Sequence, residues 1–178
     1  MVENRLFDSL KSLDTEQRNP ASQEIDLADP LEIASIINSE DKLIAQRVEQ
    51  KLPQIASAID LISKSFTVGG RLLYFGAGTS GRLGVLDAAE CPPTFGTNPE
   101  QVQGFIAGGK EAMFEAQEGA EDSEETGRQE IHNQKITSLD VVCGLAASGS
   151  TPYVHGVIKE ARENGIPTIF ITINSYVP

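Results

Sequence analysis

Residues 70–84 read GRLLYFGAGTSGRLG, and this stretch decides the fold. Residues 72–75 are a short, continuous apolar run bounded by glycines, which is typical of a strand buried on both faces. A glycine-rich turn follows at residues 76–81, and residues 80–90 then carry a helical pattern that two consecutive prolines bring to an end. A buried strand that turns into a helix in this way indicates an α/β protein with a parallel sheet.

The same alternation continues toward the C-terminus. The patterns predict further strands at residues 102–106, 140–146 and 168–173, and helices at residues 111–117, 122–135 and 152–163. Strands that alternate with helices form a parallel sheet covered on both sides, so we expect a three-layer α/β sandwich.

The N-terminal part of the chain precedes this sandwich and differs from it. The first 28 or so residues are polar and irregular, as in an arm, and Asp29-Pro30 predicts a short helix that ends near Asn38. We therefore divide the chain into an arm with a short helix at residues 1–38 and one domain at residues 39–178.

A second helical start signal at Ser39 opens a longer apolar stretch. Pro53 interrupts it and predicts a kink or a division into two helices in phase. We expect its apolar face to form core or a dimer interface, and that face consists of Ile44, Val48, Leu52, Ile55, Ile59, Ile62 and Phe66.

Composition and charge limit the function classes. The 178 residues are 39% hydrophobic and 22% charged, as in one soluble globular domain. No apolar run is long enough to span a bilayer, no secretion signal begins the chain, and two cysteines give no disulfide framework, so we expect a cytoplasmic protein without a membrane partner. A net charge of −12 without a basic stripe argues against nucleic acid but leaves a small phosphate ligand open.

The turn at residues 76–81, Gly-Ala-Gly-Thr-Ser-Gly, has the composition of a phosphate-binding loop. Glycines let the backbone approach a ligand, the N-terminus of a helix supplies N–H donors, and Thr79 and Ser80 add hydroxyl groups. The glycine spacing also fits a dinucleotide-binding turn, but the acidic residue expected about 20 residues on is missing. Arg82-Leu83 stands where a P-loop has Lys-Ser or Lys-Thr. A glycine-rich turn without a ligand remains the alternative.

A second loop of the same kind, Ala-Ser-Gly-Ser-Thr-Pro at residues 147–152, follows the predicted strand 140–146. In a parallel sheet such loops gather at the carboxyl ends of the strands, where ligands bind. Two such loops favour a phosphate site over the alternative of two ordinary helix-capping loops. The predicted phosphate-binding residues are Gly78, Thr79, Ser80, Gly81, Ser148, Gly149, Ser150 and Thr151.

Other polar residues give weaker signals. His132 and His155 have no companions at metal-ligand spacing, so no metal site is predicted. Arg82 and Lys110 are able to balance the charge of a phosphate, but they fit surface positions equally well.

Several longer sequence segments resemble the family of N-acetylmuramic acid 6-phosphate etherases. Residues 76–84 (GAGTSGRLG) and 86–94 (LDAAECPPT) together are similar to the signature stretch of that family. Residues 118–123 (EGAEDS) and 146–149 (AASG) match two further blocks, and short words between residues 24 and 42 extend the match toward the N-terminus.

This resemblance implies the sugar isomerase (SIS) fold, with a five-stranded parallel sheet between helices, in a homodimer with sites near the interface. It implies cleavage of the lactyl ether of N-acetylmuramic acid 6-phosphate to N-acetylglucosamine 6-phosphate and D-lactate during cell-wall recycling, without a metal or nucleotide cofactor. The family's catalytic glutamates fall on Glu90, the proton donor to the departing lactate, and on Glu121, the base. On the residues alone, Glu121 belongs to an acidic run typical of a solvated helix, and Glu90 is an ordinary helix-end carboxylate.

Two features depart from the family pattern. That pattern continues beyond the last predicted strand into a further loop and a helical tail, whereas this sequence ends at Pro178. Ser150 stands where related sequences usually have arginine, so a cation that would attract an anionic substrate is lost. Beside the etherase we therefore keep a non-catalytic sugar-phosphate sensor or truncated relative, and a nicotinamide-binding domain as a distant third hypothesis.

Overall fold

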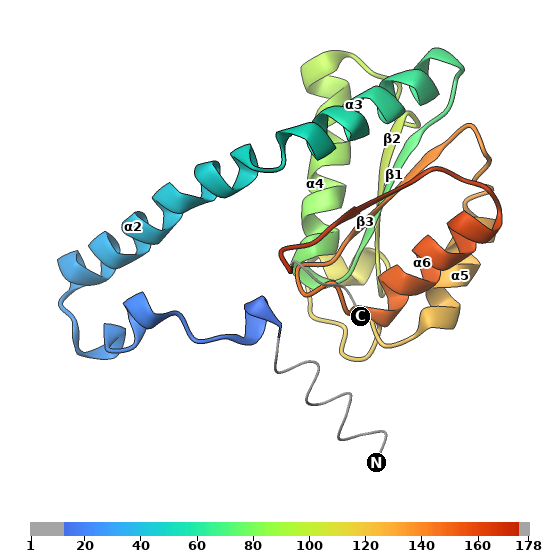
Figure 1. Cartoon of the computed structure of the whole chain (residues 1–178). Coiled ribbons are helices and arrows are strands. Elements are labelled where there is room, and N and C mark those ends of the chain that lie inside the picture. Colours follow the sequence, from blue (N-terminus) through green and yellow to red (C-terminus); the bar gives the residue numbers. More distant parts are fainter. Residues whose placement is uncertain (1–12, 175–178) are drawn as a thin grey trace. The chain divides into compact units, whose positions relative to one another are not determined.

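The computed structural model describes residues 13–174 in two compact units (Figure 1). Unit 1 comprises Glu16–Ile59, and unit 2 comprises Leu13–Thr15 together with residues 60–174. The first 12 residues of the predicted arm and the last four residues of the chain lie outside the described residues. No helix within residues 13–174 combines the length and the apolar character that crossing a membrane requires.

Unit 1 is helical. Short 3-10 turns at Pro20–Ser22 (η2) and Ile25–Leu27 (η3) lead to α2, Pro30–Glu49. Asp29 caps α2, because its Oδ1 accepts the N–H of Glu32 at 2.9 Å, as the sequence predicts.

The helix break predicted at Ser39 is wrong, since α2 continues through it. The Ser39 hydroxyl donates to the Ser35 carbonyl at 2.8 Å, so it bonds back into the preceding turn and does not cap a new helix. The division predicted near Pro53 is confirmed: α2 ends at Glu49 and α3 spans Leu52–Thr67, with Pro53 in its first turn, where a missing N–H costs little.

The apolar stripe along α2 and α3 is half-buried only at its C-terminal end. Its first five members, from Ile44 to Ile59, are between 38% and 61% exposed. In unit 2, Leu61, Ile62 and Phe66 pack against the sheet. The stripe is therefore core in its last two turns, and its exposed remainder belongs to unit 1.

Unit 2 contains a parallel sheet, as the sequence predicts. Its strands are β1 (Leu72–Gly76), β2 (Val102–Ile106), β3 (Val141–Leu145) and β4 (Thr168–Ile171), in the order β2-β1-β3-β4. The family resemblance implies five strands, and the described part of the chain contains four.

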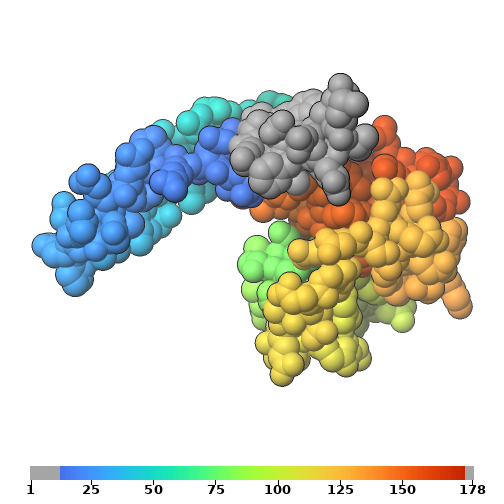
Figure 2. Space-filling model, turned by 90° about the horizontal axis from the view of Figure 1, so that it is seen from below, coloured from blue at the N-terminus to red at the C-terminus, as the bar shows by residue number. Residues whose placement is uncertain are grey.

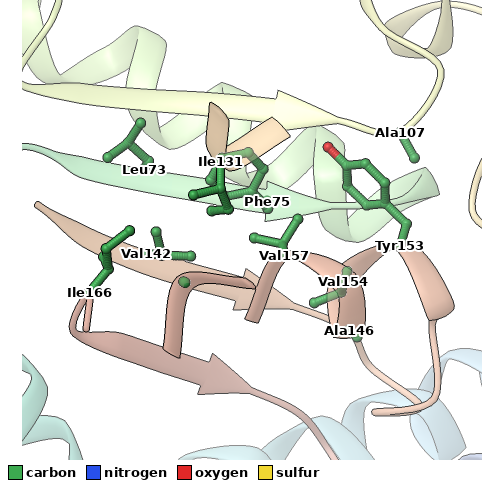
Figure 3. Packing of buried hydrophobic residues seen from close by; sticks show 11 residues of the cluster. Leu73, Phe75, Ala107, Ile131, Val142, Ala146, Tyr153, Val154, Val157 and Ile166 are labelled. Atoms are coloured by element: carbon green, nitrogen blue, oxygen red, sulfur yellow. The ribbon is translucent and has the colours of Figure 1, made fainter. Parts of the chain in front are cut away.

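Helices cover both faces of this sheet (Figure 1). On one face α4 (Gly78–Phe95) and the end of α3 pack against a cluster that includes Leu72, Val141 and Cys143. On the other face α5 (Glu124–Asn133) and α6 (Pro152–Glu163) cover the larger cluster around Leu73 and Phe75, shown in Figure 3. The predicted three-layer α/β sandwich is confirmed.

Helix α4 does not stop at its two prolines, contrary to the prediction. Pro92 and Pro93 lie inside the helix, which runs to Phe95 and ends at Gly96 in the left-handed conformation (φ +69°). The N–H of Gly96 donates to the Pro92 carbonyl at 2.8 Å and closes the last turn. Each proline removes one N–H donor from the turn before it, yet its fixed φ fits a helix, so the helix tolerates both near its end.

Helices α5 and α6 approach so closely that only glycine fits between them. A Cβ atom on Gly127 would lie 2.0 Å from the Tyr153 carbonyl oxygen, and one on Gly156 would lie 1.9 Å from the Glu124 carbonyl oxygen. This contact fixes the start of α5, and the residues just before it, against the start of α6.

Candidate functional site

The two glycine- and hydroxyl-rich loops lie side by side at one edge of the sheet. Loop 1 (residues 76–81) spans the end of β1 and the first turn of α4, and loop 2 (residues 147–152) follows β3. These two strands are paired, with Gly76 opposite Leu145. The chain leaves β1 toward β2 on one side and returns to β3 on the other, so the carboxyl ends of β1 and β3 mark the point where strand order reverses. Ligands of open α/β sheets bind at this point.

Loop 1 offers backbone donors. Gly78 begins α4 with φ +52°, a conformation that glycine adopts without strain, and open space surrounds the position of its missing side chain. Thr79 is exposed and Ser80 is half-buried in the first helical turn, where N–H groups have no partner within the helix. Gly81 is buried, and a Cβ there would lie 2.7 Å from the Gly76 carbonyl oxygen. Gly81 therefore serves the tight turn and does not face solvent.

The segment after β2 lies beside the start of α4. The Arg82 Nε donates to the Met113 carbonyl at 3.1 Å and so ties α4 to the 3-10 turn η4, Lys110–Met113. Figure 2 looks at the end of the sheet where β1 finishes, and the start of α4 (green) adjoins this segment (yellow) there. Lys110 is exposed. Residues 111–117, predicted as a helix, contain only this short turn.

Loop 2 offers hydroxyl groups more than backbone donors. The hydroxyls of Ser148 and Ser150 lie 2.9 Å apart, and Ser150 N–H donates to Ser148 Oγ at 3.2 Å. Thr151 precedes α6 as its N-cap residue, without a side-chain capping bond. Pro152, the first residue of α6, has no N–H, and Tyr153 N–H donates to the Glu121 carbonyl at 3.0 Å. The first turn of α4 and the hydroxyls of loop 2 thus both follow the carboxyl ends of paired strands at the reversal point.

The backbone of Glu121 is held at the edge of this site. Its carbonyl accepts the Tyr153 N–H at the start of α6, next to loop 2. The acidic run around Glu121 is not helical as far as Asp122. Helix α5 begins only at Glu124, and the hydroxyl of Ser123 caps this helix. Glu121 is exposed, whereas the Glu124 carboxylate binds Lys159 Nζ at 2.9 Å, and that hydrogen bond lowers the pKa of Glu124.

Glu90 lies elsewhere. It is exposed on α4, twelve residues after Gly78, which corresponds to about 18 Å along the helix axis. Within one chain the structure brings together loops 1 and 2 and the backbone of Glu121, but not Glu90. Leu83 and Leu86 share the outward face of α4 with Glu90 and are 58% and 57% exposed.

Two residues that sequence reasoning did not select also contact loop 2. His155 Nε2 lies 2.7 Å from the Gly149 carbonyl oxygen, and the buried side chain of Asn174 donates to the Ser148 carbonyl at 2.7 Å. His155 is the fourth residue of α6. In the sequence it was considered only as a metal ligand, and the absence of companions at metal-ligand spacing argued against that role. Within residues 13–174 no group of three or more His, Cys, Asp or Glu side chains is arranged to hold a metal ion.

Comparisons with known proteins agree with this fold. The model of the family described as "Glucokinase regulatory protein N-terminal SIS domain" matches residues 54–162. A solved phosphoheptose isomerase from Francisella tularensis has a similar fold, with a TM-score of 0.55, 15% identity and coverage of 79% of this chain and 74% of that one.

Closer in sequence are proteins named N-acetylmuramic acid 6-phosphate etherase. The protein from Salinibacter ruber is 55% identical over 168 residues, which cover 94% of this chain and 54% of the relative. The protein from Vibrio campbellii is 52% identical over 178 residues, which cover 100% of this chain and 58% of the relative. The chain thus spans little more than half the length of the curated relatives it matches.

Proposed function

Since this chain belongs to the SIS domain family described for the N-terminal domain of glucokinase regulatory protein, we propose that it binds an amino-sugar phosphate between loops 1 and 2. We propose further that it acts as an N-acetylmuramic acid 6-phosphate etherase, the name its relatives carry. The observation that supports the proposal is the pairing of β1 with β3, because loops 1 and 2 then start from neighbouring strands at the reversal point, where ligands of open α/β sheets bind.

The proposed reaction is an elimination followed by a hydration. In the open-chain sugar the aldehyde acidifies the C2 proton, which Glu121 removes. The C3–O bond of the lactyl ether then breaks, and Glu90 gives a proton to the departing lactate. Water adds across the C2–C3 double bond, with its oxygen on C3 and a proton returned to C2, to give N-acetylglucosamine 6-phosphate. A base and an acid of opposite protonation state are sufficient for these steps.

The product test uses the purified protein and N-acetylmuramic acid 6-phosphate in ¹⁸O-labelled water. The proposal expects D-lactate and N-acetylglucosamine 6-phosphate that carries one ¹⁸O atom, and Glu121→Gln should slow both by roughly a hundredfold or more. Glu118→Gln, in the same acidic run, serves as the matched control and should retain activity. Substrate that stays intact while bound would contradict the etherase and support a sugar-phosphate-binding module.

We propose that the site is completed by a second copy of the chain, as a homodimer. Glu90 lies about 18 Å along α4 from the loops of its own chain, too far to act there. The outward face of α4 carries exposed Leu83 and Leu86 beside Glu90, an apolar surface suited to a partner.

A twofold axis through this face would bring the required groups together. Leu83 and Leu86 lie midway along α4 between Thr79 and Glu90. Two antiparallel α4 helices that cross at this midpoint would pair Leu83 with the partner's Leu86 and would set Thr79, in loop 1, opposite the partner's Glu90. Each phosphate site would then receive its acid from the other copy.

Sedimentation velocity tests the interface. The proposal expects a dimer for the wild type and a monomer for Leu86→Glu. Leu139→Glu, at a leucine of similar exposure (52% against 57%), is the control and should remain dimeric. A wild-type monomer at micromolar concentration, or a dimer that Leu86→Glu leaves intact, would contradict the proposed contact.

We also propose that the protein works in the cytoplasm. Its proposed substrate is a charged sugar phosphate, which does not cross a lipid bilayer unaided. The free thiols of Cys91 and Cys143 accord with a reducing compartment.

A further inference from the structure

Three successive carbonyl groups of loop 2 are held from outside the loop. The Ala147 carbonyl accepts the Ile173 N–H at 3.0 Å, next to the end of β4. The Ser148 carbonyl accepts Asn174 Nδ2 at 2.7 Å. The Gly149 carbonyl lies 2.7 Å from His155 Nε2. Two of these three contacts come from side chains, which are open to substitution without a change in the backbone.

The contact of His155 fixes its proton. A carbonyl oxygen is only able to accept a hydrogen bond, so Nε2 carries the hydrogen in this contact. The ring is half-buried and lies 6.0 Å from the ring of Phe170, at an interplanar angle of 35°. Phe170 belongs to β4, so the imidazole packs against a residue of the sheet while it hydrogen-bonds to loop 2.

This hydrogen bond orients the hydroxyl groups of loop 2. The peptide that carries the Gly149 carbonyl also carries the Ser150 N–H, and in a trans peptide the two point in opposite directions. With the carbonyl held by His155, the N–H is directed at Ser148 Oγ, 3.2 Å away. The two serine hydroxyls share one hydrogen bond of 2.9 Å, so one hydroxyl hydrogen of the pair remains to donate elsewhere.

We propose that His155 and Asn174 are positioning residues that hold the hydroxyl pair of loop 2 in place for the phosphate of the bound sugar. This inference rests on the proposed function, since it assigns a task within the same site. Each residue contacts a backbone carbonyl of loop 2, not one of its hydroxyl groups. Their removal should weaken binding of the phosphorylated sugar and raise KM, while kcat changes much less.

The test compares two replacements of one histidine. His155→Phe keeps an aromatic ring against Phe170 but deletes the donor, and His155→Gln restores an N–H donor at a similar reach. His132→Phe is the matched control, because His132 hydrogen-bonds Glu160 between α5 and α6, away from loop 2. Calorimetry with N-acetylglucosamine 6-phosphate then gives the dissociation constant for each variant.

We expect His155→Phe to raise the dissociation constant about tenfold, as the loss of one half-buried hydrogen bond implies. His155→Gln should stay within about threefold of the wild type, and His132→Phe should match it. Asn174→Ala tests the second residue and should weaken binding to a similar extent. An unchanged dissociation constant in His155→Phe, or an equal loss in His155→Gln, would overturn the inference.

Hydrogen exchange separates this inference from the proposed function. Amide hydrogens of residues 147–151 should exchange faster in His155→Phe than in the wild type, with or without a ligand. A wild-type protein that binds no sugar phosphate would contradict both the proposed function and the positioning role. A wild-type protein that binds the sugar phosphate, together with a His155→Phe variant of unaltered hydrogen exchange and affinity, would contradict the positioning role alone.

Discussion

Substitution of Gly156 by alanine tests how tightly α5 and α6 fix the site. The new Cβ would lie 1.9 Å from the Glu124 carbonyl oxygen and 3.1 Å from Arg128 N, so α5 would have to move by roughly 1 Å or more. Overpacking against backbone atoms costs about 3 kcal/mol, at the upper end for added methyl groups. Alanine is the better helix former by about 1 kcal/mol, which leaves a net loss near 2 kcal/mol.

Thermal unfolding measures this loss. For a chain of this size a 2 kcal/mol loss lowers Tm by about 4–8 °C. Lys159→Ala is the control, since it removes an exposed ion pair to Glu124 between the same helices without adding an atom, and should cost less than about 1 kcal/mol. The displacement of α5 should also weaken binding of N-acetylglucosamine 6-phosphate, because Glu121 lies just before α5 and would move with it. A Gly156→Ala variant as stable as the wild type would refute the close contact between the helices.

Three further predictions concern single residues. Burial alone would raise the pKa of Asp140, but hydrogen bonds from Arg71 and Thr137 outweigh burial and hold that pKa below its usual value. The Asp140 carboxylate therefore stabilises the fold above about pH 4, and this stabilisation is lost as the pH falls further. Asp140→Asn should therefore cost about 3 kcal/mol in urea unfolding at pH 7, and a gap to wild type that does not narrow toward pH 3 would contradict this. Gly78→Ala should lower stability by about 1 kcal/mol in thermal unfolding, because φ is +52° there although space is open. Burial raises the pKa of the Cys143 thiol to about 12, so a thiol reagent at pH 8 should leave Cys143 unlabelled in the folded protein, and rapid labelling would refute that burial.

The sheet could be predicted from local sequence signals alone. Each strand is a short apolar run, and the predicted strand at residues 102–106 coincides with β2. The adjacency of loops 1 and 2 also followed, since parallel strands end at one edge. Helix ends were harder to predict. The Ser39 hydroxyl bonds back into its own helix, and α4 includes its two prolines and ends only at Gly96. Both outcomes depend on which neighbouring groups compete for the same backbone atoms.

The candidate site could be predicted only in part. Glycines and hydroxyls in loops have a direct chemical signature, so both loops were found. The contact of His155 is with a carbonyl six residues away in the chain, and that of Asn174 is with one 26 residues away. No spacing rule encodes either contact, so the roles proposed for the two residues could not be predicted. The separation of Glu90 from the loops follows from its position twelve residues after Gly78 on α4, and the predicted helix at residues 80–90 already implied a similar separation.

Subunit complementation tests the central claim most directly, namely that each phosphate site takes Glu121 from one chain and Glu90 from its partner. Glu90→Gln and Glu121→Gln homodimers should each be almost inactive. After the two are mixed, unfolded and refolded together, random pairing should restore about a quarter of wild-type lactate release, because half of the dimers would contain one intact site of two. A mixture in which dimers form but activity stays at the level of the separate variants would contradict the claim.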